Sequence, residues 1–230
     1  MKWKEEREQV VRDLGRILVQ TRAIQFGTFT LSSGKMSSYY VDLRIVPSYP
    51  DVFEKAVTAY IDAVKNLIGL EKVDAVAGVP TSGLTYATAV AYNLRKPLIY
   101  VRDEVKEYGT AKKIEGVMKP GAKVVILDDL ITTGNSLIKT IDAIRSEGGE
   151  VDNAVVLIDR LEGGRERLAE KKVKLNPVTD MLELTNLLYD MDLINEDENA
   201  AVKSQIQQGA ARTPTGKGRF SSRSDRWSDS

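Results

Sequence analysis

A run in the middle of the chain combines side chains suited to binding a phosphorylated sugar. The apolar stretch 124–127 is followed by Asp128 and Asp129, and then by Leu-Ile-Thr-Thr-Gly-Asn-Ser, which ends at Ser136. Backbone N–H groups and hydroxyls in a small-residue turn before a helix can hold a phosphate. The two carboxylates would repel a phosphate in the same place, but they can accept hydrogen bonds from vicinal sugar hydroxyls. The run therefore predicts a site for a ribose 5-phosphate.

The same residues also have a purely structural interpretation. Aspartate at a strand end and Thr or Ser before a helix are ordinary capping residues. The aspartate pair alone would favour that interpretation. The whole run from Asp128 to Ser136, directly after an apolar strand, favours the ligand site instead.

The absence of two residue types limits the chemistry. The chain has no histidine and no cysteine. A Ser-His-Asp triad, a histidine base, a thiolate nucleophile and a zinc–thiolate site are therefore impossible. Catalysis must rely on carboxylates, lysine, arginine, tyrosine, hydroxyls, backbone amides or a metal ion held by oxygen atoms.

The charge and hydropathy of the chain favour a protein in an aqueous compartment. It has 33 basic and 33 acidic residues, so we expect no nucleic-acid partner for the chain as a whole. The N-terminal residues are charged, and no apolar run approaches the ~20 residues that a membrane-spanning helix needs. We expect a soluble, cytoplasmic protein without a membrane partner, and the lack of cysteine fits a reducing compartment.

The elements around the central run alternate between apolar strands and amphipathic helices. A first helix is predicted up to about Ala23, and an extended hairpin over residues 26–42. Continuous apolar runs are typical of strands buried between two helix layers. The alternation predicts an α/β, doubly wound, mainly parallel sheet, with ligands bound beyond the carboxyl ends of its strands. The strands are predicted over residues 73–79, 98–101, 124–127 and 155–158.

Two segments depart from that alternation. Residues 102–121 are rich in cations and glycines, and a loop of this length is either functional or a solvated surface excursion. Residues 195–230 are rich in Ser, Gly and Gln, and their basic C-terminal part has few apolar residues. We therefore predict one domain over residues 1–194 and a disordered tail over residues 195–230.

Over roughly residues 10–190 the sequence resembles the orotate phosphoribosyltransferases, a branch of the type I phosphoribosyltransferase family. The run 124–136 is similar to that family's phosphoribosyl-diphosphate signature. The N-terminal hairpin, in an archaeal-like form, and the pair Asp159-Arg160 resemble the orotate branch in particular. Residues 78–84 resemble its diphosphate loop, and residues 102–110 its mobile catalytic loop. The resemblance implies a type I phosphoribosyltransferase fold, with an N-terminal helix and a β-hairpin hood.

The resemblance also implies a reaction and its partners. Ribose 5-phosphate would be transferred from phosphoribosyl diphosphate (PRPP) to orotate, giving orotidine 5-phosphate and diphosphate, a step of pyrimidine biosynthesis. The cofactor implied is Mg²⁺, held mainly through the substrate's diphosphate, so no direct protein ligand to the metal is expected. A homodimer with shared active sites is implied, because the catalytic loop of one subunit serves its neighbour in this family.

By resemblance, the catalytic residues are Lys106, Asp128 and Asp129. The carboxylates would hold the ribose, and residues 132–136 its 5-phosphate. The residues expected to bind orotate are Thr132, Arg160 and Tyr40, although a purely structural role for Tyr40 is open. Those expected to bind PRPP are Arg102, Lys106, Tyr108, Thr81, Ser82, Gly83, Asp128, Asp129, Leu130, Ile131, Thr132, Thr133, Gly134, Asn135 and Ser136.

The sequence departs from the family pattern at two places that bear on activity. Asp103 stands where the catalytic loop commonly has lysine, and Ser82 replaces a usual glycine of the diphosphate loop. Two other functions are alternatives on the same fold: a purine phosphoribosyltransferase and a non-catalytic ligand-sensing regulator. The hairpin and Arg160 disfavour the first, and neither end of the chain has a convincing helix-turn-helix to support the second.

Overall fold

A six-stranded sheet forms the centre of the computed structural model, which describes residues 2–30, 34, 36–102 and 113–212. The strand order is β5-β4-β3-β6-β7-β8, and all neighbours are parallel except the edge pair β4 and β5. The strands are β3 (Ala75–Gly78), β4 (Leu98–Val101), β5 (Ile114–Glu115), β6 (Lys123–Ile131), β7 (Glu150–Asp159) and β8 (Lys174–Asp180).

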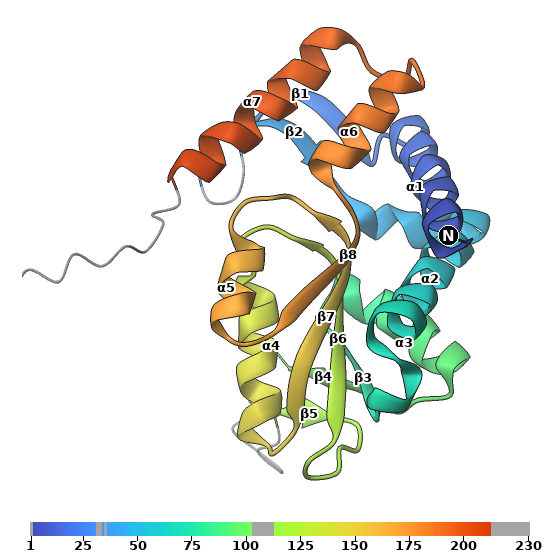
Figure 1. Ribbon diagram of the computed structural model, residues 1–230, viewed down its shortest axis with the longest axis vertical. Helices are drawn as coiled ribbons and strands as arrows, with labels where there is room; N and C mark the ends of the chain where they lie inside the picture. The colour runs from blue at the N-terminus through green and yellow to red at the C-terminus, as the bar shows by residue number, and fades with distance from the viewer. Residues whose placement is uncertain (1, 31–33, 35, 103–112, 213–230) are drawn as a thin grey trace, which may run out of the picture.

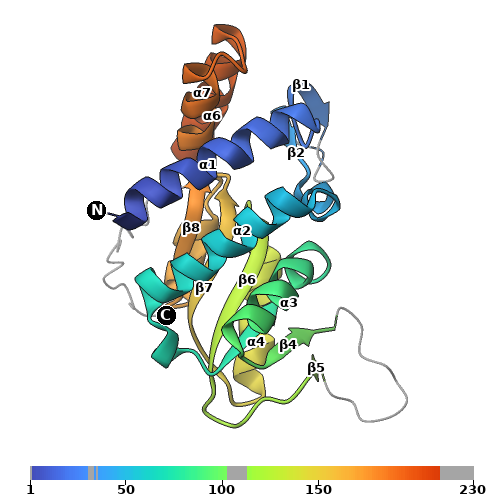
Figure 2. The ribbon, with the colours of Figure 1, turned by 90° about the vertical axis from the view of Figure 1, so that its right-hand side faces the viewer.

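Helices cover both faces of this sheet, as the apolar strands predict (Figures 1 and 2). Val125 and Leu127 of β6 join the apolar core formed with the helices of one face, and Val124 and Ile126 join the core of the other. The doubly wound arrangement is therefore confirmed. The first face carries α1 (Lys2–Gln20), α2 (Pro50–Ala63) and α3 (Ser82–Leu94), and the second carries α4 (Asn135–Ser146) and α5 (Gly164–Glu170).

A hood of separate elements lies over one end of the sheet (Figure 1). It consists of the antiparallel hairpin β1 (Ile24–Thr30) and β2 (Met36–Val41) with the helices α6 (Met181–Asp190) and α7 (Glu196–Arg212). The described part of the chain also has three short helical segments: η1 (Leu43–Ser48) directly after the hairpin, then η2 (Val64–Ile68) and η3 (Leu70–Lys72) between α2 and β3.

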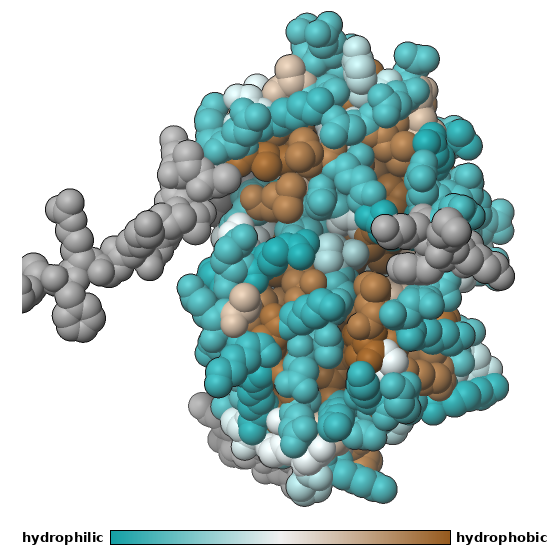
Figure 3. Space-filling model, in the orientation of Figure 1, coloured by the Kyte–Doolittle hydropathy of each residue, from teal (hydrophilic) through white to brown (hydrophobic). Residues whose placement is uncertain are grey.

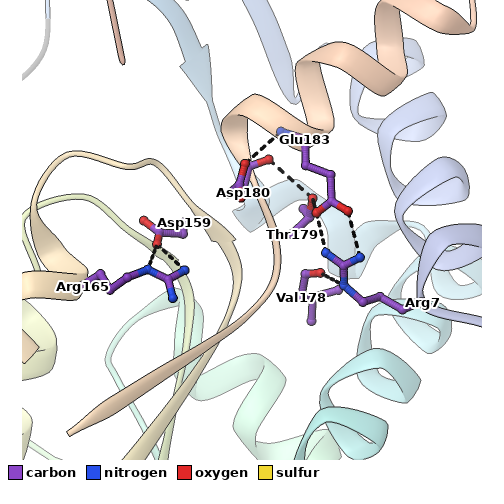
Figure 4. A network of polar contacts seen from close by, with 7 residues as sticks. All are labelled: Arg7, Asp159, Arg165, Val178, Thr179, Asp180 and Glu183. Carbon is purple, nitrogen blue, oxygen red and sulfur yellow. Dashed lines mark hydrogen bonds and ion pairs between the residues drawn. The ribbon is translucent and has the colours of Figure 1, made fainter. Parts of the chain in front are cut away.

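A polar network joins the N-terminal helix to the hood (Figure 4). Arg7 of α1 donates to the carbonyl of Val178 at 2.7 Å and forms a two-point ion pair with Glu183 of α6. Asp180 accepts from the backbone N–H of Glu183 and so caps α6. Because a guanidinium that pairs through two nitrogens has a fixed orientation, these contacts fix α1 against the end of β8.

Strand β6 is longer than its apolar run predicts, and strand β8 is an addition to the predicted strands. β6 continues through the acidic pair to Ile131, because its backbone stays paired with β7 as far as Asp159. A strand over residues 174–180 was not predicted at all, since it contains Pro177. Proline removes one backbone donor, and β8 tolerates it because it lies at the sheet edge.

The expectation of a disordered tail from residue 195 is wrong over residues 196–212, which form α7. Val202 is fully buried, and Ile206 packs against the same core one turn later. Gln205 accepts hydrogen bonds from the backbone N–H and the hydroxyl of Ser38 in β2. A few apolar residues at helical spacing thus suffice to order a polar segment against the hairpin. The remainder of the expected tail, residues 213–230, lies outside the described residues.

Hydrophilic side chains dominate the face of the molecule shown in Figure 3, with apolar patches between them. Among the described residues, no helix combines the length and the apolar character needed to cross a bilayer.

Candidate active site

The strand order reverses at the neighbouring strands β3 and β6, so the loops that follow them lie side by side. Gly78 is paired with Leu127, and the N–H of Val79 donates to the carbonyl of Leu127 at 3.0 Å. Open α/β sheets bind ligands at such a position. A cavity of about 470 Å³ lies there, lined by Arg44, Val79, Pro80, Thr81, Ser82, Asp128, Asp129, Leu130, Ile131, Thr132, Thr133, Gly134, Asn135, Ser136 and Leu137.

The start of α3 presses against the acidic pair at a glycine. A Cβ atom on Gly83 would lie 2.7 Å from Oδ1 of Asp128 and 2.7 Å from the carbonyl oxygen of Leu127. Gly83 therefore lies behind the cavity wall, while Thr81 and Ser82 line it. The peptide bond between Pro80 and Thr81 is cis. The hydroxyl of Ser82 is buried, with no hydrogen-bond partner in the described part of the chain.

The acidic pair, Asp128 and Asp129, is partly withdrawn from solvent, and this burial changes the pKa of Asp128. Asp128 is 8% exposed, and burial, followed by the charge of Asp129, holds its pKa well above the ordinary range. Its Oδ1 accepts from the N–H of Asp129, and Oδ1 of Asp129 accepts from the N–H of Leu130. The buried hydroxyl of Tyr60 in α2 donates to the backbone carbonyl of Asp128. A hydroxyl donor or a positive charge bound here would stabilise the ionised pair.

The turn after β6 has the geometry of an anion site. Gly134 has a φ of +77° and immediately precedes α4, so the helix N-terminus opens at the cavity wall. Helix α5 supports this turn from behind: Nη1 of Arg167 donates to the carbonyl of Thr133 and to Oδ1 of Asn135, both at 2.6 Å. No local sequence pattern indicates this role of Arg167, because the contact joins segments more than thirty residues apart.

Arg160 and Tyr40 do not line this cavity. Arg160 is 6% exposed, and its guanidinium lies over the ring of Tyr39, 4.7 Å from the centroid. Its Nη2 is 2.9 Å from a carboxylate oxygen of Glu162. The backbone N–H of Arg160 donates to the carbonyl of Ile131, so Arg160 follows the neighbouring strand end beside Thr132.

The hood therefore places Tyr39 on Arg160, a partner that the sequence did not single out. The Tyr40 hydroxyl instead accepts a hydrogen bond from Nη2 of Arg44 at 3.2 Å. Alternating residues of a strand point to opposite faces, so only one of two adjacent tyrosines can cover Arg160. The adjacent residues Tyr39 and Tyr40 indicate that a hairpin tyrosine contacts Arg160, but the sequence does not show which of the two faces the sheet.

The segment expected to close the site is only partly described. Arg102 pairs with Glu115 at 2.7 Å and does not line the cavity. Lys106, Tyr108 and Asp103 lie outside the described residues.

Arg44 is a cavity residue that the sequence analysis missed. Among the described residues that line the cavity, it is the one cation. Its place at the cavity depends on the contact between the neighbouring Leu43 and Tyr86 of α3, which no local pattern in the sequence indicates.

Comparisons with known proteins agree with this geometry. Residues 50–190 match the family described as "Phosphoribosyl transferase domain". The chain is 41% identical over 185 residues to the orotate phosphoribosyltransferase of Cenarchaeum symbiosum, covering 80% of this chain and 92% of that protein. It is 45% identical to the orotate phosphoribosyltransferase of Pyrobaculum aerophilum, over 83% of this chain and 96% of the relative.

The chain belongs to the orotate phosphoribosyltransferase family. A solved structure of that family shares its fold: orotate phosphoribosyltransferase from Aeropyrum pernix has a TM-score of 0.64 at 36% identity, covering 78% of this chain and 99% of that one. UMP synthase from Leishmania donovani gives a TM-score of 0.76 at 34% identity, over 86% of this chain and 42% of that one. The expected type I phosphoribosyltransferase fold is confirmed.

Proposed function

We propose that the chain transfers ribose 5-phosphate from PRPP to orotate, releasing diphosphate and forming orotidine 5-phosphate. The bond from ribose C1 to the diphosphate oxygen breaks with its electron pair on oxygen, and a ring nitrogen of orotate bonds to C1 while its proton passes to the departing diphosphate. One observation carries the proposal beyond the family relationship. Asp128 and Asp129 line a single cavity together with the loop 80–82 and the turn 132–136, which provides a place for each part of the sugar substrate.

The acidic pair is proposed to hold the ribose and to stabilise its positive charge as the C1–O bond breaks. Catalysis of this kind depends on charges that are already in position when the transition state forms. Backbone bonds fix both carboxylates before any ligand binds. Leu130, Ile131 and the turn 132–136 would hold the 5-phosphate, with the N-terminus of α4 adding a favourable dipole.

The diphosphate is proposed to bind between the loop after β3 and the catalytic loop. Thr81, Ser82 and Gly83 belong to the first of these. Arg102, Lys106 and Tyr108 would come from the second, with Lys106 supplied by the other subunit of a homodimer. Arg102 stands at the base of that loop, where Glu115 holds its side chain.

Orotate is proposed to bind beneath the hood, gripped by Thr132 and Arg160 with Tyr40 nearby. The support is positional, since Arg160 follows β7 beside the end of β6 and its guanidinium is already oriented by Tyr39. A planar guanidinium can donate two parallel hydrogen bonds to a carboxylate or to ring oxygens.

The residues present fit a magnesium ion that the substrate carries. Asp128 and Asp129 add negative charge beside the diphosphate loop, while the ion itself would be held mainly by the substrate's diphosphate oxygens and water, with no direct protein ligand. When bound, Mg²⁺ would neutralise charge on the departing diphosphate. A cytoplasmic location belongs to the same proposal, because the substrates are charged metabolites and the chain has no cysteine.

A single assay tests the proposal: purified protein, PRPP, Mg²⁺ and orotate, with the loss of orotate absorbance followed over time. Turnover with orotate that disappears in Asp129→Asn is the expected result. Turnover with adenine or guanine in place of orotate would favour the purine alternative. Ligand binding without turnover of any base would favour the sensing alternative.

A further inference from the structure

Arg44 is held rigidly at the edge of the cavity. The preceding residue, Leu43, is fully buried, and its carbonyl accepts a hydrogen bond from the hydroxyl of Tyr86 at 2.8 Å. Oδ1 of Asp42 accepts from the backbone N–H of Arg44 and caps the short helix η1. The backbone at Arg44 is therefore fixed from two sides, although its side chain is 64% exposed.

The guanidinium has a fixed orientation and unused donors. Nε donates to Oδ1 of Asp42 at 2.7 Å, and Nη2 donates to Oδ2 of the same carboxylate at 2.8 Å. Nη2 also donates to the hydroxyl of Tyr40 at 3.2 Å. Nη1 takes part in no hydrogen bond with any described residue, so two N–H groups of a cavity-lining side chain remain available.

A cation in this cavity would offset the negative charge of the proposed substrate and of the acidic pair. Its described lining carries two carboxylates, while the proposed sugar substrate brings a phosphate and a diphosphate. The 5-phosphate turn has a helix N-terminus and several backbone N–H groups. At the other end, the loop 80–82 offers fewer donors, since Pro80 lacks an N–H.

The position of Arg44 in the fold selects the diphosphate end. The carbonyl of Leu43 is bound by Tyr86, which lies one helical turn after Ser82 in α3. Helix α3 covers one face of the sheet, whereas α4, which carries the 5-phosphate turn, covers the other. Arg44 thus enters the cavity from the side of the loop 80–82.

We propose that Arg44 is a binding residue for the diphosphate of PRPP and for the diphosphate released after transfer. This inference rests on the proposed function, because it assigns one more contact to the same substrate. Nη1 would donate to a diphosphate oxygen while Asp42 and Tyr40 hold the other edge of the guanidinium. A lysine at this position would keep the positive charge. Its ammonium group cannot bind Asp42 and the diphosphate through two separate edges, so Arg44→Lys should keep only part of the diphosphate binding.

Isothermal titration of three probes tests the inference: PRPP, inorganic diphosphate and ribose 5-phosphate, each with Mg²⁺. In Arg44→Gln we expect the affinity for PRPP and for diphosphate to fall at least about tenfold, which is about 1.4 kcal/mol. The affinity for ribose 5-phosphate should stay within about twofold, since that probe lacks the diphosphate. Arg44→Lys should give an intermediate loss for the first two probes.

The matched control is Arg16→Gln, which removes another exposed arginine, this one from α1, and should change none of the affinities. Equal weakening of all three probes in Arg44→Gln would assign Arg44 a structural role and overturn the inference. Unchanged diphosphate and PRPP affinities would overturn it as well. If the unaltered protein binds no PRPP, the proposed function itself fails, and that result is distinguishable from the other two.

Discussion

The ring of Tyr39, on the hairpin, covers the guanidinium of Arg160, which follows β7, with 4.7 Å between the guanidinium carbon and the ring centroid. Nε of Arg160 also donates to the Tyr39 hydroxyl at 3.3 Å. The hood is therefore attached to the sheet through the residue proposed to grip orotate. Nη2 of the same guanidinium lies 2.9 Å from the buried carboxylate of Glu162.

The first prediction concerns Tyr39. Tyr39→Phe keeps the stacked ring and loses only a long hydrogen bond, so we expect the KM for orotate to rise by no more than about threefold. Tyr39→Leu also loses the cation–π contact, and the KM should rise by about tenfold. Steady-state kinetics with both substrates measures this, with the exposed Tyr189→Leu as control. A parallel rise in the KM for PRPP would indicate general damage to the site instead.

The second prediction concerns pH and Asp128. Burial raises the pKa of this carboxyl in the folded protein above its unfolded value of about 4. The buried site therefore favours the protonated form of Asp128. The contribution of this form to the stability of the protein is fully present below the unfolded pKa and is lost as pH rises through the folded pKa. Asp128→Asn, which cannot ionise, should melt higher than the unaltered protein at neutral pH while losing activity.

Thermal unfolding of ligand-free protein from pH 4 to pH 8 checks the second prediction. The gain in Tm of Asp128→Asn should be small at pH 4 and increase with pH. Each kcal/mol gained in the free energy of unfolding should raise the Tm by about 2–4 °C. Asp142→Asn, in an exposed ion pair with Lys171, is the control and should show no such increase. A gain that is the same at every pH would mean that ionisation of Asp128 is not its cause.

The third prediction concerns the close contact behind the cavity. Gly83→Ala places a Cβ atom 2.7 Å from Oδ1 of Asp128 and from the carbonyl of Leu127, so α3 must move away from β6. We expect a loss of about 1–3 kcal/mol in the free energy of unfolding and weaker PRPP binding. Gly209→Ala, where a Cβ meets nothing within 4 Å, should be neutral or stabilising by up to about 1 kcal/mol. Chemical denaturation compares the two, and an unchanged Gly83→Ala protein would contradict the packing argument.

The parts of this molecule that the sequence predicted are those with local patterns. Apolar runs of four or more residues identified the central strands, because strands between two helix layers are buried on both faces. The run from Asp128 to Ser136 placed the acidic pair and the anion turn together, since both follow one strand. The structure brings that run and the loop 80–82 into one cavity, as the strand order requires.

The parts that the sequence did not predict depend on contacts between distant segments. Arg167 supports the turn at Thr133 from another helix, and Arg44 reaches the cavity from the segment after the hairpin. No spacing along the chain reports such contacts. The helix over residues 196–212 was missed for a related reason: its composition is polar, and only Val202 and a few neighbours anchor it.

The final prediction concerns that helix and the hairpin. Oε1 of Gln205 accepts from the backbone N–H of Ser38 at 2.6 Å, and Nε2 donates to the hydroxyl of Ser37 at 3.1 Å. Tyr39 follows directly, so these bonds help to fix the ring that orients Arg160. Gln205→Leu leaves the Ser38 N–H without its partner, which should cost about 1–3 kcal/mol of stability.

The kinetic consequence separates a positioning role for Gln205 from general destabilisation. We expect the KM for orotate to rise several-fold in Gln205→Leu, with kcat and the KM for PRPP nearly unchanged at a temperature where the protein stays folded. Gln208→Leu is the matched control, because the side chain of Gln208 donates to Ser204 within the same helix and, among the described residues, makes no hydrogen bond to the hairpin. An orotate KM that is equal in the two variants would mean that α7 covers the hairpin without positioning the proposed orotate site.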